Sequence, residues 1–306
     1  MIARTPLLAA LAVILAAAAA TAQPEAQAIR KNARVLPALG RLPDPLLADL
    51  TPYRAILFGE IHGTREAPRL ALELARLMAR GKGNSWLGLE LPTSAQADLD
   101  RFRATGDANI LKRMPFFRRP PEQQDGRSSA AMGSLLQVAQ KVPNLPLYCL
   151  DTEEPDRDAG MAREFARHMA EHPGSVGVAL VGNMHARVTQ GAPWDPGYRP
   201  MGYNLSHGLV PATQVLGIDL AYQQGTAWSV ADKNGRQVAA LHPLLPPSQP
   251  IFATAVQWGG YFLKLPTITD GFGAVFFWRT LSASPPFVPP GAAPLPSPST
   301  RPSSPS

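Results

Sequence analysis

Short apolar runs that end at glycine or acidic residues alternate along this chain with longer segments in which apolar residues recur at helical spacing. Apolar runs of roughly four to eight residues, bounded by such residues, are typical of buried β-strands. We therefore predict four strands in the first two thirds of the chain. They span residues 55–58, 86–89, 145–150 and 176–181.

The segments between these strands predict helices. In residues 66–80 the leucines recur every three or four positions, and Gly81 is expected to end that helix. Ser94 is expected to be the N-cap of the next helix. The predicted helices span residues 66–80, 94–103, 128–142 and 158–172.

Helices between successive strands require parallel crossovers, so the first four strands should form a parallel sheet with helices on its faces. Residues 215–220, 226–230 and 274–278 predict further strands joined by shorter connections. The predicted fold class is a three-layer α/β fold. It has a central, mainly parallel sheet with helices on both faces and extra antiparallel strands towards the C-terminus.

The first residues of the chain resemble an export signal. Arg4 precedes a nearly unbroken apolar stretch over residues 7–20, and Ala20-Thr21-Ala22 matches the small-x-small cleavage pattern. A membrane anchor is the alternative, but the stretch is shorter than the ~20 residues that a span needs. We expect residues 1–22 to be a signal peptide and the mature protein to be exported, periplasmic or extracellular, with no stable membrane anchor after signal removal.

Composition divides the rest of the chain into a domain and a tail. Residues 283–306 are almost entirely Pro, Ser, Ala and Gly, which bury too little apolar surface to fold, so they are predicted to be disordered. Residues 23–282 are predicted to form a single α/β domain. The one cysteine, Cys149, lies in an apolar run and is expected to be a buried strand residue, and no internal disulfide can form.

The net charge of +6 comes from scattered basic residues with one local cluster. Lys112, Arg113, Arg118 and Arg119 flank two phenylalanines, but a nucleic-acid-binding protein would have a longer basic stripe interleaved with aromatic residues. No nucleic-acid partner is expected. A solvated loop or a contact with an acidic ligand is the preferred interpretation of this cluster.

Two motifs with a glycine followed three residues later by a histidine come directly after predicted strands. They are Gly59-Glu60-Ile61-His62 and Gly182-Asn183-Met184-His185. The strand between them in the chain ends at Glu90. Because parallel strands present their carboxyl ends at one sheet edge, where ligands of open α/β sheets bind, we expect Glu60, His62, Glu90, Asp151 and His185 to converge there.

The chemistry of this set leaves two uses open. Imidazoles among carboxylates can activate water as general bases or can hold a divalent metal, for which His62, Glu90 and His185 are the candidate ligands. Arg157, just after the third strand, could reach the crevice and pair with a carboxylate or a substrate oxyanion, or lie on the surface. The candidate catalytic residues are Glu60, His62, Glu90, Arg157 and His185.

The motifs together resemble the haem-binding uptake Tiki superfamily, which includes ChaN-like domains and is related to the erythromycin esterase and Tiki/TraB families. The resemblance covers about residues 50–230 and implies an α/β fold with a largely parallel sheet between helices. The matching residues are Gly59-Glu60-Ile61-His62-Gly63, Glu90, Arg157-Asp158 with Met161-Ala162, and Gly182-Asn183-Met184-His185-Ala186.

The resemblance implies several activities. In the esterases the first-motif Glu and His, here Glu60 and His62, activate water against a lactone together with a further Glu. Tiki-type members resemble metal-dependent proteases, and ChaN-like members bind haem, often through a tyrosine, for which Tyr148, Tyr198 and Tyr203 are candidates. The esterases leave one more residue between Glu and His, which favours the ChaN-like and Tiki-like branches.

We therefore predict an exported protein with a hydrolase-like His/Glu site that activates water, with metal assistance left open. Its partner would be a small-molecule or peptide substrate. The alternative is a protein that binds haem or a metal ligand without catalysis.

Overall fold

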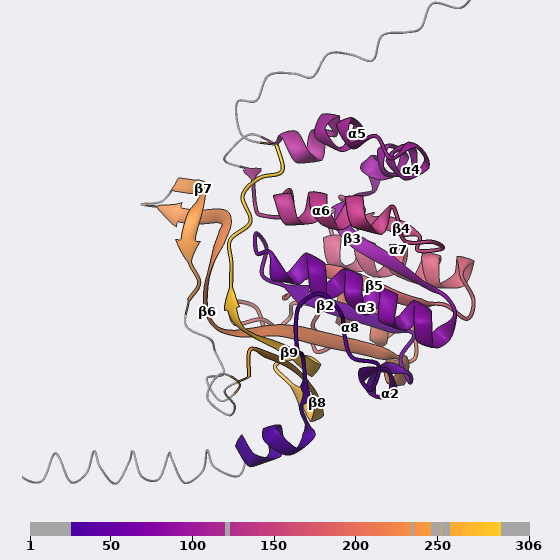
Figure 1. Cartoon of the computed structure of the whole chain (residues 1–306), viewed down its shortest axis with the longest axis vertical. Helices are drawn as coiled ribbons and strands as arrows, with labels where there is room; N and C mark the ends of the chain where they lie inside the picture. The colour runs from indigo at the N-terminus through magenta and orange to yellow at the C-terminus, as the bar shows by residue number, and fades with distance from the viewer. Residues whose placement is uncertain (1–25, 120–122, 234–235, 246–251, 253–257, 289–306) are drawn as a thin grey trace, which may run out of the picture.

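The strands of this protein form one twisted sheet. The computed structural model describes residues 26–119, 123–233, 236–245, 252 and 258–288 (Figure 1). In this part of the chain the sheet has nine strands in the order β1-β8-β9-β6-β2-β5-β3-β4, with β7 beside β6. The strands are β1 (Arg34–Val35), β2 (Ala55–Glu60), β3 (Ser85–Pro92), β4 (Leu147–Asp151), β5 (Val176–Gly182), β6 (Val215–Lys233), β7 (Arg236–Pro243), β8 (Gly260–Thr269) and β9 (Phe272–Leu281).

Helices connect the strands and cover the sheet on both sides. The α-helices are α2 (Leu46–Leu50), α3 (Glu66–Lys82), α4 (Gln96–Thr105), α5 (Ala108–Arg113), α6 (Ala130–Ala139), α7 (Arg157–Glu171) and α8 (Met201–Ser206). Short 3₁₀ helices are η1 (Thr93–Ala95), η2 (Pro115–Arg118) and η4 (Ala212–Gln214).

The pairing of the strands confirms the predicted fold class. β2 pairs in parallel with β5 and β6, β3 pairs in parallel with β4 and β5, and β9 pairs in parallel with β6. The antiparallel partners are β1, β7 and β8, and the last two come late in the chain, as predicted. Four neighbouring strands, β2, β5, β3 and β4, therefore end at one edge.

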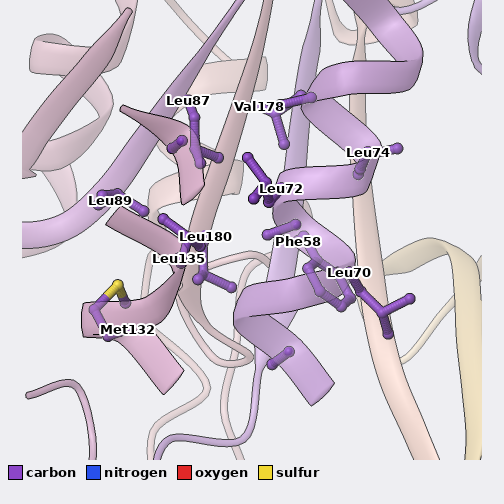
Figure 2. Packing of buried hydrophobic residues seen from close by; sticks show 14 of the residues in the cluster. Phe58, Leu70, Leu72, Leu74, Leu87, Leu89, Met132, Leu135, Val178 and Leu180 are labelled. Carbon is purple, nitrogen blue, oxygen red and sulfur yellow. The ribbon is translucent and has the colours of Figure 1, made fainter. Parts of the chain in front are cut away.

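Side chains point alternately to the two faces of the sheet along each central strand, so the core there has one layer on each face. In β2, Ile56 and Phe58 pack in the layer formed with α3 and α6, whereas Ala55 and Leu57 pack in the layer formed with α7 and α8. Figure 2 shows the first layer, in which Phe58 and Leu180 of the sheet meet Leu70 and Leu72 of α3. Both faces of the central strands are buried, which explains why these strands are continuous apolar runs.

Two predicted helix boundaries were wrong. Gly81 does not end its helix, because α3 continues to Lys82 and stops at Gly83, which has φ 82°. The missing side chain at Gly81 instead leaves room for Leu47 of α2, whose Cδ2 would lie 2.1 Å from an added Cβ. Ser94 is not the N-cap of α4, since it lies within η1 and its hydroxyl donates to Glu153 Oε2 at 3.3 Å.

The predicted strands at residues 215–220 and 226–230 are one strand, β6. The polar residues between them stay extended because β9 continues beside them, with Gln224 opposite Thr280, and β7 pairs from Thr226 onward. A polar stretch in an isolated sequence gives no sign of such neighbours.

The packed chain extends beyond the predicted domain boundary at residue 282. Thr64 bridges Ala283, Ser129 bridges Pro286, and Ser284 and Val288 are buried. In Figure 1 this segment follows β9 and runs past α6 towards α5. The boundary therefore lies at least six residues later, because backbone hydrogen bonds and Phe287 hold a segment whose composition is typical of disorder.

The predicted signal peptide at residues 1–22 and the tail from residue 289 lie outside the described residues. Among the residues that the structure describes, no helix has the length and apolar character needed to cross a membrane.

Candidate functional site

The structure brings the five sequence-predicted site residues together at the carboxyl edge of the sheet. Glu60 ends β2, and His62 follows it in the next turn. Glu90 lies near the end of β3, His185 follows β5, and Arg157 begins α7. The two glycine motifs contact each other there. Asn183 N donates to Glu60 O at 3.0 Å, and an added Cβ at Gly59 would lie 2.8 Å from Asn183 Cα.

Glu60 and His62 form the first carboxylate–imidazole pair. His62 Nδ1 donates to Glu60 Oε1 at 2.9 Å, and Glu60 is buried whereas the His62 side chain is 24% exposed. The turn that carries His62 is fixed from two other segments. Gly63 O accepts from Trp228 N at 3.1 Å and from Ser284 N at 2.7 Å.

Asp158 and His185 form a second pair of the same kind. His185 Nδ1 donates to Asp158 Oδ1 at 2.7 Å. Asp158 is fixed in turn, because Tyr198 donates its hydroxyl to Oδ2 at 2.8 Å and Met201 N donates to Oδ1 at 2.6 Å. Asp158 lies in the first turn of α7, but the side chain that caps this helix is that of Asp156, which accepts from Ala159 N at 3.0 Å.

The carboxylate of Glu90 lies between the two imidazoles. His62 Nε2 is 3.7 Å from Glu90 Oε2, and His185 Nε2 is 3.8 Å from Glu90 Oε1. Gly182 N donates to Oε2 at 2.7 Å. Both rings also flank Gly182, with His62 Nε2 and His185 Cδ2 3.1 and 3.5 Å from the place of an added Cβ. Gly182 therefore makes the space in which the two histidines approach each other.

Two arginines balance the carboxylates. Arg157 donates from Nη2 to Glu90 Oε1 at 2.6 Å and to Asp151 Oδ2 at 2.7 Å. Arg127 donates from Nη1 to the same two carboxylates at 3.1 and 3.2 Å. Of the two positions that the sequence allowed for Arg157, the structure shows the one in which its side chain pairs with the site carboxylates. Arg127 is not among the candidate residues from the sequence, because nothing local in the sequence shows that its side chain reaches Glu90 on β3.

Burial and charge set the protonation of this cluster. Burial alone raises the pKa of Glu90, but the positive charges of protonated His62 and then of Arg127 and Arg157 outweigh it, so the pKa of Glu90 lies far below its usual value. Burial alone lowers the pKa of His62, but the carboxylates of Glu90 and Glu60 outweigh it, so the pKa of His62 lies above its usual value.

The two histidines differ in the hydrogen bonding of their Nε2 atoms. A guanidinium can only donate, so Arg157 Nη1, 3.0 Å from His185 Nε2, makes that nitrogen an acceptor. His185 is therefore a neutral imidazole whose proton is on Nδ1, towards Asp158. His62 has the same Nδ1 arrangement with Glu60, but its Nε2 lies 3.7 Å from Glu90 Oε2 and has no hydrogen-bond partner within 3.5 Å among the described residues.

The donor set does not suit the divalent metal that the sequence left open. Both oxygens of Glu90 already accept from cations or from a backbone N–H, and Arg157 occupies the lone pair of His185 Nε2. A metal at His62, Glu90 and His185 would also lie against two guanidinium charges. Within the described part of the chain, no group of three or more His, Cys, Asp or Glu side chains is arranged to hold a metal.

The tyrosines and the cysteine also have defined roles. Tyr198 is committed to Asp158, Tyr148 hydrogen-bonds His172 Nε2 at 2.5 Å, and Tyr203 stacks on His207. Cys149 is buried in β4 as predicted, and burial raises the pKa of its thiol to about 12, which is unsuited to a nucleophile.

Several solved structures of other proteins have the same fold as this chain. The erythromycin esterase EreC, as a mutant in its open conformation, superimposes with a TM-score of 0.61 over 81% of this chain and 98% of its own, at 12% identity. This chain has the erythromycin esterase fold. The fold resemblance predicted from the motifs is therefore confirmed.

Two other structures share the fold. A protein from Bacillus cereus matches with a TM-score of 0.64 at 12% identity, over 87% of this chain and 99% of its own. A succinoglycan biosynthesis protein matches with a TM-score of 0.63 at 10% identity, over 86% of this chain and 98% of its own. ChaN of Campylobacter jejuni, in a structure of cofacial haem binding, reaches a TM-score of only 0.36, too low to support an argument. No family model and no curated protein matches the sequence.

Proposed function

We propose that this protein is a hydrolase in which His62 activates a water molecule without a metal. The observation that carries this proposal is the Glu60–His62 pair. The Nδ1 of His62 is held by the buried carboxylate of Glu60 at 2.9 Å, its Nε2 has no hydrogen-bond partner within 3.5 Å among the described residues, and the side chain is 24% exposed. A buried carboxylate that fixes the tautomer of a histidine is the arrangement by which hydrolases prepare a general base.

The proposed step uses neutral His62. A water molecule beside Nε2 gives up a proton to that nitrogen while its oxygen forms a bond to the acyl carbon of the substrate. The carboxylates of Glu60 and Glu90 then stabilise the imidazolium, and His62 returns the proton to the leaving group as the bond between that group and the acyl carbon breaks. Glu90 itself is held ionised, so it supplies charge rather than a proton.

Arg157 is the proposed group for the developing oxyanion. Its Nη1 donates one hydrogen to His185 Nε2 and has a second hydrogen, while Nη2 and Nε anchor it on Glu90 and Asp151. A guanidinium fixed in this way stabilises negative charge with little reorganisation. Asp158 and Tyr198 would act through His185, as positioning residues that hold Arg157 in place.

The proposed mechanism suits an ester, lactone or amide of a small molecule or peptide as the substrate. The test is hydrolysis of a panel of chromogenic esters by the purified mature protein, compared with Glu60→Gln and His62→Ala. Loss of activity in both variants, with the thermal unfolding midpoint retained, is the expected result. Equal activity of His62→Ala and the parent protein would reject the proposal.

The same protein preparation tests the two alternatives. Because the donor set does not suit a metal, activity should survive dialysis against a chelator, and metal analysis should find no stoichiometric divalent ion. Haem binding without catalysis predicts instead a Soret band on addition of hemin, abolished by His62→Ala or His185→Ala, with no hydrolysis of any ester.

Export is part of the same proposal and rests on residues 1–22 alone. The intact mass of the protein recovered from outside the cytoplasm should correspond to a chain that begins at Gln23. A mass that includes Met1 in that fraction would contradict it.

A further inference from the structure

A cavity of about 650 Å³ lies next to the candidate site, at the same edge of the sheet. Two of its lining residues lie at or just beyond the ends of the strands that deliver the site carboxylates. Pro92 ends β3, which carries Glu90, and Glu153 follows the end of β4 at Asp151. Ligands of open α/β sheets bind outside the carboxyl ends of the strands, so the cavity has the place of a substrate pocket.

Two arginines, Arg118 and Arg119, line the cavity, and Arg119 stacks on an aromatic ring. The Cζ of Arg119 lies 4.4 Å from the ring centroid of Phe116, and both residues line the cavity. Stacking on an aromatic ring holds a guanidinium in place at little entropic cost. Arg119 therefore presents its N–H groups from a defined position.

The charge of Arg119 is only partly compensated. Its Nη1 lies 3.2 Å from Asp125 Oδ2, which also accepts from Arg127 Nε at 2.9 Å and from Nη2 at 2.5 Å. In the described part of the chain this shared oxygen is the ion-pair partner of Arg119. Burial and then the charge of Arg127 lower the pKa of Arg119, as expected for a cation that lacks an anion of its own.

Two acidic residues line the cavity beside the cation. Asp98 pairs with Arg101 at 2.7 Å, whereas Glu153 accepts, within the described part of the chain, only a hydrogen bond from the neutral Ser94 hydroxyl, at 3.3 Å, and keeps its negative charge. Glu153 also has φ 58°, a costly conformation for this residue, and its N–H lies 3.3 Å from Asp151 Oδ1. Strain of this kind concentrates at functional sites, and here it lies between the cavity and the candidate site.

We propose that this cavity binds the anionic end of the substrate, a carboxylate or a phosphate, through Arg119. The apolar part next to that anion would lie against Phe116, Pro92 and Pro115. This proposal rests on the proposed hydrolase function and adds the substrate class, an ester or amide with a negative charge beside an apolar or aromatic group. Arg119 is then a specificity-determining residue. It belongs to the basic cluster for which the sequence favoured an acidic ligand or a solvated loop.

Binding of three inert probes tests the proposal without turnover. Isothermal titration calorimetry of the purified protein would compare 3-phenylpropionate, 2-phenylethyl phosphate and the neutral 3-phenylpropionamide. At least one anionic probe should bind about tenfold or more tightly than the amide, since hydrogen bonds to charged groups contribute about that factor. Preference for the carboxylate or for the phosphate would identify the anion.

Variants show whether Arg119 carries this preference. Arg119→Gln should weaken binding of the preferred anion on the order of tenfold and leave the amide unchanged, whereas Arg119→Lys should keep part of the preference. Arg80→Gln, which removes an exposed positive charge on α3, is the matched control and should bind as the parent does. Thermal melts of all variants report folding. Equal binding of the three probes, absence of binding, or an unchanged preference in folded Arg119→Gln would overturn the proposal.

Failure of this proposal can be distinguished from failure of the hydrolase function. If the cavity binds anions but the protein hydrolyses no ester, the pocket stands and the hydrolase function fails. If the protein hydrolyses neutral and anionic esters equally, with equal kcat/KM in Arg119→Gln, the hydrolase function stands and the pocket proposal fails.

Discussion

His62 and His185 have nearly equivalent surroundings and are expected to differ in function because of one hydrogen bond. Each donates from Nδ1 to a carboxylate, at 2.9 and 2.7 Å, and each places Nε2 beside Glu90. Arg157 donates to Nε2 of His185, whereas Nε2 of His62 has no hydrogen-bond partner within 3.5 Å among the described residues. The assignment of base and positioning residue follows from this difference rather than from the motifs, which are alike.

Substitution of the two histidines tests this assignment. His62→Ala removes the general base, so kcat should fall by about 10²- to 10⁴-fold. His185→Ala leaves the base in place but frees Arg157, so kcat should fall less and remain measurable. His207→Ala, at the exposed histidine that forms the C-cap of α8, is the control and should match the parent. The reverse order of the two effects, measured on the most rapidly hydrolysed ester, would exchange the roles.

The pH dependence of hydrolysis tests the environment of His62. Neutral His62 is the active form, and neighbouring carboxylates raise its pKa, so the acid limb of the kcat/KM profile should lie above the ordinary value of about 6.5. Glu60→Gln removes one of these negative charges and a hydrogen-bond acceptor for the charged form, so the acid limb should move to lower pH. A limb that Glu60→Gln leaves in place would show that another group titrates.

The partners of the site residues were harder to predict than the residues themselves. Strand ends can be inferred from apolar runs, and that inference places Glu60, Glu90 and both histidines at one edge. Asp158 and Tyr198 are set by how α7 and the loop before α8 approach His185, and Arg127 by a loop that crosses β3. These are contacts between distant segments, for which the sequence pattern has no local sign.

At the scale of elements, buried parallel strands were predicted well and locally ambiguous segments were not. The four apolar runs became β2, β3, β4 and β5 because strands buried on both faces leave a continuous signal. Gly81 was misread because a glycine within a helix and a glycine that ends one look alike, and only packing against Leu47 distinguishes them.

The C-terminal segment is the part of the chain in which the structure differs most from the prediction. Residues 283–288 hold the start of α6 and the turn of His62. Ala130 N donates to Pro285 O at 2.7 Å, Ala131 N to Ser284 Oγ at 2.8 Å, and Ser284 N to Gly63 O at 2.7 Å. Phe287 packs on Phe117, with ring centroids 5.1 Å apart. The segment therefore supports both the core and the site.

Two truncations measure this support. Removal of residues 283–306 should lower the free energy of unfolding by at least about 3 kcal/mol, the usual cost of deleting one buried aromatic side chain, and should lower kcat because the Gly63 turn loses a hydrogen bond. Removal of residues 289–306 alone is the matched control, and its composition predicts little change. Equal stability of the two truncated chains in urea denaturation would contradict the role of the segment.

At the scale of the whole molecule, the site joins parts of the chain that are far apart. Carboxylates and cations from β3, β4, α7 and the loop before α6 meet in one network, so its charge state affects how the layers hold together. Glu90, Asp151 and Asp125 all have a pKa below the usual value. In each case burial alone would raise it, and neighbouring positive charges outweigh that effect: those of protonated His62 and then of Arg127 and Arg157 at Glu90, chiefly that of Arg157 at Asp151, and chiefly that of Arg127 at Asp125.

This network predicts how stability depends on pH. In the unfolded chain these carboxyls regain ordinary pKa values near 4, so their contribution is fully present above about pH 5. As the pH falls further, the unfolded state binds protons first, and the contribution is lost progressively as the pH approaches the folded pKa values. The protein should therefore lose stability between about pH 5 and pH 2.

Glu90→Gln isolates the contribution of the central carboxylate. At pH 6 the variant should be much less stable than the parent, because Arg127 and Arg157 lose their shared anion while remaining partly buried. The difference in unfolding free energy, from urea denaturation, should shrink as the pH falls towards 3, where protonation of Glu90 in the unfolded parent removes its advantage. Asp44→Asn, at an exposed carboxylate, should differ little from the parent at any pH. A difference for Glu90→Gln that stays constant from pH 6 to pH 3 would mean that Glu90 acts through packing rather than through charge.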